Sequence, residues 1–236
     1  MATSRRSVVN ETGAAEVPVT PNRSITIPPV RFQLARFQLV GLPDVPLVVH
    51  RFSAKVKQEM KTKMETGKAA SGRKNRSPKN SMQTYNEARY RSREGWDGFN
   101  AAAIRKAMIS ACRLTTIKMV LAKLSVFVEK DGVDRDEPQI PLIRIIGDPV
   151  LQEDMARVAT GEPYVAIRPA YFNWRAFVTI KWDSDQFLLE DVTNLLMRVG
   201  QQVGICEGRP DSKNSAGMGW GLFEIERPET LSNAAD

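Results

Sequence analysis

The 236-residue chain contains very little cysteine and histidine. Cys112 and Cys206 are its only cysteines, and His50 is its only histidine. Two cysteines argue against a disulfide scaffold and favour a reducing compartment, so we expect a cytoplasmic protein. One histidine leaves little for a structural zinc site or a histidine-based catalytic triad. We therefore expect His50 to be a packed side chain, and we expect no metal and no cofactor.

Long apolar runs are also missing from the sequence. No stretch approaches the roughly 20 apolar residues that a membrane-spanning helix needs, so the sequence predicts no membrane partner. Residues 1–24 have none of the apolar character of a secretion signal. We expect residues 1–24 to form a flexible arm and residues 228–236 a flexible tail. The hydrophobic content of 42% is enough for a sizeable core between them.

Acidic residues are scarce in one part of the chain. The segment from Arg51 to Arg93 holds thirteen Lys and Arg against three Asp and Glu, a net charge of +10. Since the whole chain carries +7, the remainder carries −3. Such clustering is typical of an element that binds a polyanion. The alternative is a solvated loop that only aids solubility.

Apolar patterning in the middle of the chain predicts an α+β fold. Residues 25–42, 176–182 and 220–226 alternate as strands do. Residues 99–114 and 187–199 have the spacing of helices, and Asp97 or Asn100 is placed to cap the first of them. Further elements are expected as strands within residues 123–132 and 140–149, and as a short helix or turn within residues 150–161.

The resulting order, β-α-β-β-α-β, is that of a ferredoxin-like (RRM-like) unit, in which an antiparallel sheet carries two helices on one face. The other face is then open to the insertion or to a ligand. We expect residues 25–227 to form a single domain with a basic insertion at residues 54–97. The first third of that insertion has the composition of a basic helix, and its middle that of a loop.

Aromatic residues alternate with arginines towards the end of the insertion. Single-stranded nucleic acid is bound by this mixture, because rings stack on bases and cations pair with phosphates. The alternative is that Trp96 only anchors the insertion to the core. The candidate contacts in this region are Arg51, Lys55, Lys57, Lys61, Arg73, Lys74, Arg76, Lys79, Tyr85, Arg89, Tyr90, Arg91, Arg93 and Trp96.

A glycine-rich loop, "GICEGRPDSKNSAGMGWG", precedes the last expected strand. Glycines let backbone N–H groups approach a phosphate or base closely, and nearby cations supply charge. The order helix, loop, strand excludes a dinucleotide or P-loop motif, which needs strand, loop, helix. We expect this loop to lie near the start of the 99–114 helix, although its glycines could serve only to turn the chain. Its candidate contacts are Gly208, Arg209, Lys213, Gly217, Gly219 and Gly221.

The C-terminal unit, with this loop, resembles the RAMP superfamily of RNA-binding proteins, the backbone and processing subunits of CRISPR effector complexes. The resemblance covers about the last sixty residues and implies a ferredoxin-like fold with RNA contacts in the glycine loop. It also implies RNA contacts in a thumb-like insertion, a place that residues 54–97 occupy. Through the stretches "GRPDSKNSAGMGWGLFEI" and "NAAAIRKAMISACR", most of residues 25–227 also resembles tailed-bacteriophage proteins of unknown function, which implies action in the host cytoplasm.

Catalytic patterns are weaker than binding patterns in this sequence. Asp97 could hold a metal in a cleavage site, whereas Asp183 and Asp185 are placed to cap the helix that follows them. No set of nucleophile, base and orienting residue is visible. The sequence therefore favours a non-enzymatic protein that binds single-stranded RNA or DNA. The alternatives are a phage structural protein that forms homo-oligomers or filaments, and a metal-dependent nuclease.

Overall fold

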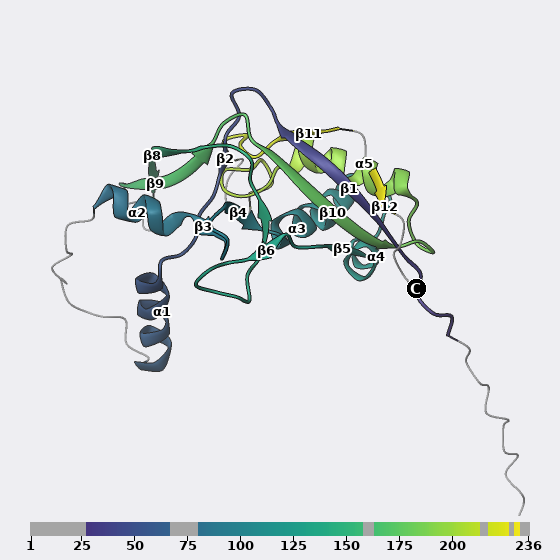
Figure 1. The fold of residues 1–236 in the computed structure, drawn as a ribbon, viewed down its shortest axis with the longest axis horizontal. Coiled ribbons are helices and arrows are strands. Elements are labelled where there is room, and N and C mark those ends of the chain that lie inside the picture. Colours follow the sequence, from purple (N-terminus) through teal and green to yellow (C-terminus); the bar gives the residue numbers. More distant parts are fainter. Residues whose placement is uncertain (1–26, 67–79, 158–162, 213–216, 227–228, 232–236) are drawn as a thin grey trace, which may run out of the picture.

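The computed structural model describes residues 27–66, 80–157, 163–212, 217–226 and 229–231. The expected arm at residues 1–24 and five of the candidate cations lie outside this part. Those cations are Arg73, Lys74, Arg76, Lys79 and Lys213. The side chain of Lys55 also lies outside it. The described part is a mixture of helices and antiparallel sheets, so the expected α+β class is confirmed (Figure 1).

The main sheet has five strands in the order β11-β1-β10-β5, and β12 also pairs with β1. Every pairing between these strands is antiparallel. The long central pair joins Phe32 to Asp183 at one end and Val40 to Arg175 at the other. The strands are β1 (Phe32–Gly41), β5 (Val126–Val128), β10 (Arg175–Asp183), β11 (Phe223–Ile225) and β12 (Glu229–Leu231).

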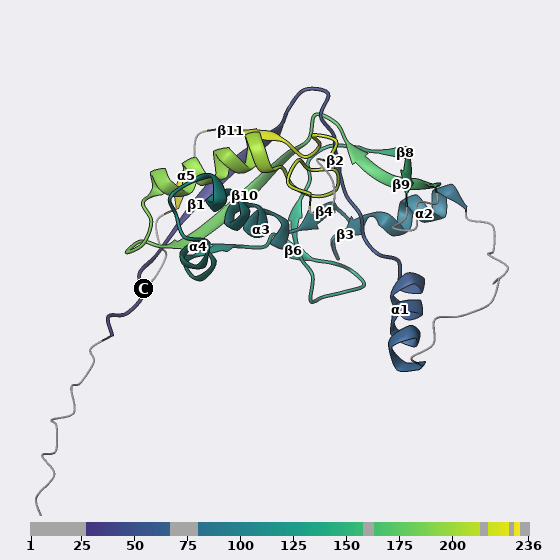
Figure 2. The same cartoon turned by 180° about the vertical axis from the view of Figure 1, so that it is seen from behind.

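Helices cover one face of this sheet, as Figures 1 and 2 show from opposite sides. Alternate residues of β1 and β10, such as Phe37 and Val178, are fully buried against these helices. The apolar stripes of α3 and α5, with Ile104 and Leu196 at their centres, close the core from the other side. The helical segments are α3 (Ala102–Ala111), the 3₁₀ turn Cys112–Leu114, α4 (Met119–Ser125), α5 (Leu189–Arg198) and the π turn Val199–Val203.

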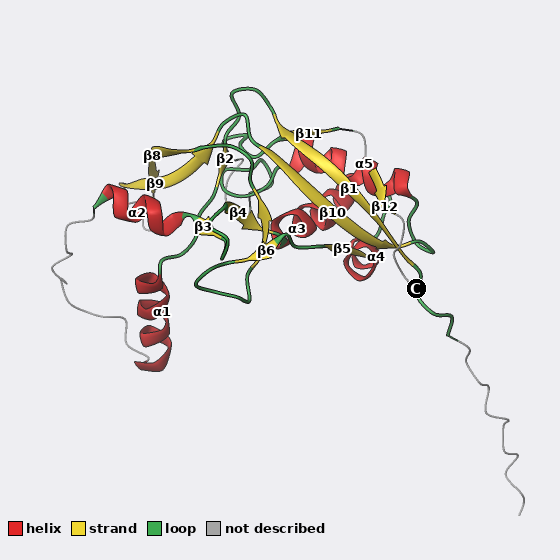
Figure 3. Ribbon diagram, in the orientation of Figure 1, coloured by secondary structure: helices red, strands yellow, loops and turns green. Residues whose placement is uncertain are grey.

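Two smaller sheets and two further helices extend the molecule to one side (Figure 3). One sheet has the order β2-β9-β8 and the other the order β3-β4-β7-β6. Helix α1 projects away from the rest of the described molecule, whereas α2 packs on β9. The strands are β2 (Leu47–Val48), β3 (Tyr90–Arg91), β4 (Asp97–Asn100), β6 (Gly132–Val133), β7 (Pro141–Arg144), β8 (Pro149–Arg157) and β9 (Pro163–Tyr171). The helices are α1 (Ala54–Thr66) and α2 (Ser81–Ala88).

The start of the first core helix differs from the sequence expectation. Residues 97–100 form β4, because they pair with β7 through the register Phe99 to Ile143, and α3 begins only at Ala102. The N-cap position is Ala101, but Asn100 just before it still satisfies a donor of the first turn, since its Oδ1 accepts a hydrogen bond from the Ala102 N–H at 2.9 Å. Asp97 does not cap this helix.

Two other local expectations were wrong. The segment 150–161, expected as a helix or turn, contributes to the strand β8, which pairs with β9 over nine residues. Asp183 and Asp185 do not cap α5, because that helix begins at Leu189. Asp183 Oδ1 instead accepts the Asp185 N–H at 2.9 Å, and Asp191 accepts the Leu188 N–H at the helix start.

Candidate nucleic-acid interface

The glycine-rich loop is held in one shape by its own backbone. The Ile205 N–H donates to the Gly221 carbonyl at 3.0 Å, and the Met218 N–H donates to the Gly208 carbonyl at 2.7 Å. A Cβ on Gly221 would collide with the Ile205 carbonyl oxygen, and its φ is +69°. Gly221 is therefore needed for the fold of the loop.

Gly219 differs from the other glycines of this loop. Its φ is +76°, but a Cβ placed on it would meet no described heavy atom within 4 Å. The left-handed backbone favours glycine at this position, whereas packing does not demand it. Gly219 is thus the glycine of the loop whose surroundings leave space for a ligand.

The loop and the first turns of α3 line a common cleft, which we call the loop cleft. Its volume is about 680 Å³. This geometry places the loop near the start of the 99–114 segment, as the sequence predicts. The cleft is lined by Val49, His50, Phe52, Tyr90, Asn100, Ala102, Ala103, Lys106, Ala107, Ser110, Ile205, Cys206, Glu207, Arg209 and Asp211.

Two cations of the loop cleft are placed to meet an anion. Lys106 is exposed on α3, four residues after Ala102, the first residue of that helix. Arg209 is half-buried, and its Nη1 donates to the Cys206 carbonyl at 2.9 Å. Sequence reasoning missed Lys106, although its i, i+4 relation to Ser110 on the polar side of the helix could have indicated it.

The acidic residues of the loop cleft are already engaged by basic partners. Glu207 Oε2 accepts from Arg168 Nε at 2.8 Å and lies 3.6 Å from His50 Nδ1. Asp211 accepts from Ser110 and pairs with Arg113. Because of these two partners, the Ser110 hydrogen bond first, the pKa of Asp211 is lowered below its usual value.

His50 lines the cleft as a neutral side chain at pH 7. Burial lowers its pKa below the usual value, and Arg168 lowers it further, while Glu207 acts in the opposite direction. The expectation that His50 packs is consistent with its ring lying 4.7 Å from that of Phe52. Burial also raises the pKa of Cys206 to about 12, so its thiol is no nucleophile at neutral pH.

Two basic candidates of the insertion start are tied to acidic side chains. Arg51 is 9% exposed, and its Nη2 lies 3.1–3.2 Å from carboxylate oxygens of Asp134, Asp136 and Glu137. Lys57 pairs with the same Glu137. These ion pairs hold the start of α1 to the loop between β6 and β7. Because the carboxylates already neutralise both cations, Arg51 and Lys57 are poor partners for a phosphate.

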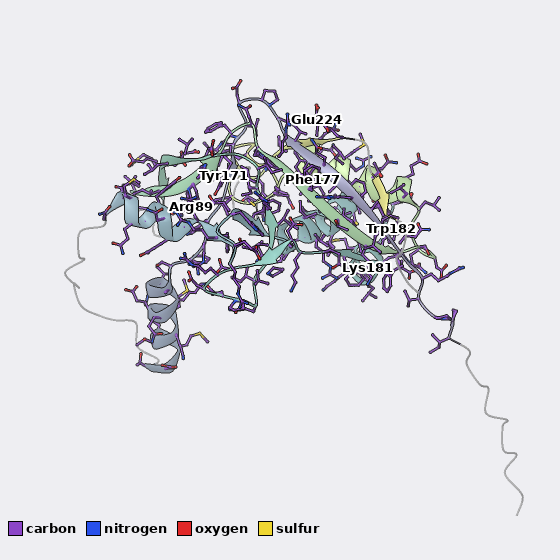
Figure 4. The ribbon with its side chains drawn as sticks, in the orientation of Figure 1. Arg89, Tyr171, Phe177, Lys181, Trp182 and Glu224 are labelled. Carbon is purple, nitrogen blue, oxygen red and sulfur yellow. The ribbon has the colours of Figure 1, made fainter. Side chains whose placement is uncertain are left out.

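Aromatic and basic candidates near α2 are engaged by partners within the fold, in the region where Figure 4 labels Arg89 and Tyr171. Arg89 Nε donates to Asp97 Oδ2 at 3.0 Å, and the Tyr171 hydroxyl donates to the same oxygen at 2.9 Å. Tyr85 is buried and donates its hydroxyl to the Pro149 carbonyl at 2.9 Å. Asp97 is therefore engaged by an arginine and a tyrosine. Arg91 Nε lies 3.9 Å from the other Asp97 oxygen.

The remaining described candidates of the insertion reach the surface. Lys61 and Arg93 are exposed, and Tyr90 lines the loop cleft. Trp96 is half-buried and lines a separate hollow with Arg36 and Phe177. The candidate residues thus divide into those held by partners within the fold, such as Arg51 and Arg89, and those exposed at the surface, such as Lys61 and Arg93. Composition alone could not separate the two groups.

Within the part of the chain that the structure describes, no three His, Cys, Asp or Glu side chains converge as ligands of a metal would. In the same part, no helix has both the length and the apolar character needed to cross a membrane.

Comparison with known proteins finds a distant structural likeness. No family model and no curated protein matches the chain. Among solved structures, the chain is similar to one chain of "Cryo-EM structure of the Type III-B Cmr-beta bound to cognate target RNA", with 12% identity and a TM-score of 0.43. The match covers 86% of this chain and 62% of that one, so this chain spans less than two thirds of that chain's length.

Proposed function

We propose that this protein is a non-enzymatic nucleic-acid-binding protein that prefers single-stranded RNA or DNA and acts in the cytoplasm. The observation that carries the proposal is the segregation of charge: +10 in residues 51–93 against −3 elsewhere. A polyanion is the partner that such a segment fits. The loop cleft adds Arg209 and Lys106, and Gly219 of the same loop has open space where a side chain would lie.

The strand order supports a finer proposal about the fold. With α3 between β1 and β5, and α5 between β10 and β11, the order β11-β1-β10-β5 corresponds to 4-1-3-2 of a β-α-β-β-α-β unit. We propose that this core is ferredoxin-like and that the chain is RAMP-like. The insertion between β1 and α3 then carries the charge, and the glycine loop lies before the last core strand.

The proposal is tested by titrating the full chain with single-stranded RNA, single-stranded DNA and duplex DNA of equal length across a salt series. We expect tighter binding of the single strands, with log affinity falling as log salt rises. Replacement of Arg73, Lys74, Arg76 and Lys79 by alanine should make that slope shallower by up to about 0.7 for each phosphate that is no longer neutralised. An unchanged slope together with a lower melting temperature would show that this loop is structural, and the absence of binding to all three would refute the function.

A second candidate function, self-association, is favoured by β8. This nine-residue strand lies at the edge of the β2-β9-β8 sheet as far as that sheet is described, and Val150 and Met155 on it are 52% and 75% exposed. An edge of this kind can pair with a second copy. Sedimentation of the wild type and of Val150→Lys would show a dimer or filament that the lysine removes, whereas a monomer at all concentrations would exclude this role.

A further inference from the structure

The face of the main sheet that points away from the helices carries rings and cations. Since side chains alternate along a strand, burial of Ala176, Val178 and Ile180 turns Phe177 and Lys181 to the opposite face. Figure 4 labels both residues along β10. Among the described elements, no helix covers this face in either view (Figures 1 and 2).

This face contains a hollow, which we call the sheet-face hollow. Its volume is about 530 Å³, and it lies where the main sheet meets the β3-β4-β7-β6 sheet. It is lined by Arg36, Trp96, Asp131, Arg144, Ile146 and Phe177. It is separate from the loop cleft, because no residue lines both.

Two glycines make room for the largest ring of the hollow. A Cβ on Gly98 or on Gly132 would lie within 3.0 Å of the six-membered ring of Trp96. The indole therefore rests on the backbone of β4 and β6, while part of its surface stays open to the hollow. This packing fixes the position of the ring before any ligand arrives, which lowers the entropic cost of stacking.

The second ring of the hollow lies under a cation. The Arg36 guanidinium carbon lies 4.5 Å from the centre of the Phe177 ring, and Arg36 is exposed. A guanidinium plane on an aromatic ring can stack a base on its free side. Further along the same face, Lys181 Nζ lies 4.4 Å from the Phe32 ring centre. Rings and cations thus continue along the face from the hollow.

The charge of the lining favours an anionic ligand over a cationic one. Arg36 and the exposed Arg144 face a single acid, Asp131, whose Oδ2 accepts the Arg144 backbone N–H at 2.8 Å. A ligand that presents both flat rings and negative charge fits this combination, and single-stranded nucleic acid has both.

We propose that the sheet-face hollow stacks a base of single-stranded nucleic acid between Trp96 and the Arg36–Phe177 pair. This inference rests on the proposed function but concerns a different surface. The loop cleft and the basic insertion would bind phosphates, whereas the hollow would distinguish a strand that carries bases from one that does not.

The test compares a single-stranded DNA oligonucleotide with an abasic oligonucleotide of the same length and charge. We expect the wild type to bind the base-carrying strand at least tenfold more tightly than the abasic strand. Phe177→Leu keeps the apolar volume but removes the ring, and should bring the two affinities within about threefold, with an unchanged salt slope. Thr179→Ala, on the same face of β10 but outside the hollow, is the matched control and should keep the full difference.

Each outcome decides one of the two proposals. Equal wild-type affinities for the two strands, or a full difference in a folded Phe177→Leu protein, would overturn the stacking site and leave the proposed function standing. Binding of neither strand would overturn the stacking site, and the proposed function would fall with it only if single-stranded RNA and duplex DNA also failed to bind. Thermal melts confirm that each variant is folded, and Trp96→Leu, which removes the other ring, should reproduce the loss.

Discussion

Asp97 illustrates how a residue that suggests chemistry can instead be structural. It is 8% exposed, and one of its oxygens accepts from both Arg89 and Tyr171. A buried carboxylate of this kind is tolerated only because its partners are in place. The position of Asp97 before a helix suggests a metal ligand, but its partners come from the end of α2 and from β9, which no local pattern reveals.

We expect Asp97→Ala to destabilise the protein by about 3 kcal/mol, because it leaves the Arg89 guanidinium partly buried without its carboxylate. Asp148→Ala, an exposed position with the same change of charge, should stay within about 0.5 kcal/mol of the wild type. Chemical denaturation of the two variants measures both values. If Asp97→Ala lowers the free energy of unfolding no more than Asp148→Ala does, Asp97 does not have this structural role.

His50 gives the molecule a predictable response to acid. Since its pKa in the folded state lies below that of the unfolded chain, the unfolded state takes up protons more readily as the pH falls. Above about pH 6.5, His50 is neutral in both states and does not reduce the free energy of unfolding. As the pH falls from there through the folded pKa, protonation of the unfolded chain lowers that free energy. The groups that face the ring are Arg168, Glu207 and Phe52.

Between pH 7.5 and pH 5, we expect the melting temperature of the wild type to fall by roughly 1–3 °C more than that of His50→Gln. Glutamine keeps a polar side chain in the cleft but cannot titrate. Parallel pH profiles of the two proteins would show that His50 contributes nothing to the acid response. Asp211 affects the stability only in a more acidic pH range, because its pKa lies below the usual value of a carboxyl.

The glycine loop shows which parts of an element the sequence can and cannot specify. Its composition predicted a backbone that approaches a phosphate or base beside Arg209, which stays a prediction, whereas four of its glycines serve the loop's own packing. Gly208 makes room for the Trp220 ring, and Gly221 for the Ile205 carbonyl. Those contacts join residues from both ends of the loop, so they depend on tertiary structure that a glycine count does not report.

Substitutions at Gly219 and Gly221 should have opposite effects, the first on nucleic-acid binding and the second on stability. Gly219→Asn should leave the melting temperature nearly unchanged, because asparagine tolerates positive φ and the site is open, yet weaken nucleic-acid binding by more than tenfold. Gly221→Ala should lower the melting temperature by several degrees, since its Cβ meets backbone. Thermal melts and binding titrations on both variants separate the effects. Normal binding by Gly219→Asn would leave the loop without a role in recognition.

The main strands and helices followed from apolar periodicity, because burial on one face imposes it. The alternation in β1 and β10 and the helical stripe of α5 are the clearest cases. The β8–β9 hairpin was missed, since the alternation of β8 is interrupted by polar residues such as Glu153 and Asp154. The sheet-face hollow was missed for another reason: Arg36, Trp96 and Phe177 come from three distant strands or turns, and only the folded sheets bring them together.

The distribution of charge over the whole molecule explains why position, not net charge, should control binding. Lys61 and Lys63 are exposed on the projecting helix α1, whereas Lys118 and Lys123 are exposed at the start and in the last turn of α4, which lies on the opposite side of the molecule in Figure 1. Removing either pair lowers the net charge by two. Long-range attraction alone would respond to both pairs alike at low salt, but direct binding to phosphates responds only to the pair that touches the strand.

We therefore expect Lys61→Gln with Lys63→Gln to weaken single-strand binding by at least fivefold and to reduce the salt slope by about 0.7 for each phosphate that is no longer neutralised. Lys118→Gln with Lys123→Gln should change the affinity less than twofold near physiological salt, where exposed charges farther apart than about 8 Å are largely screened. Anisotropy titrations at several salt concentrations measure both quantities on the same oligonucleotide. Equal reductions in affinity from the two pairs would mean that α1 attracts the strand only through overall charge, and α1 would then not be part of the binding surface.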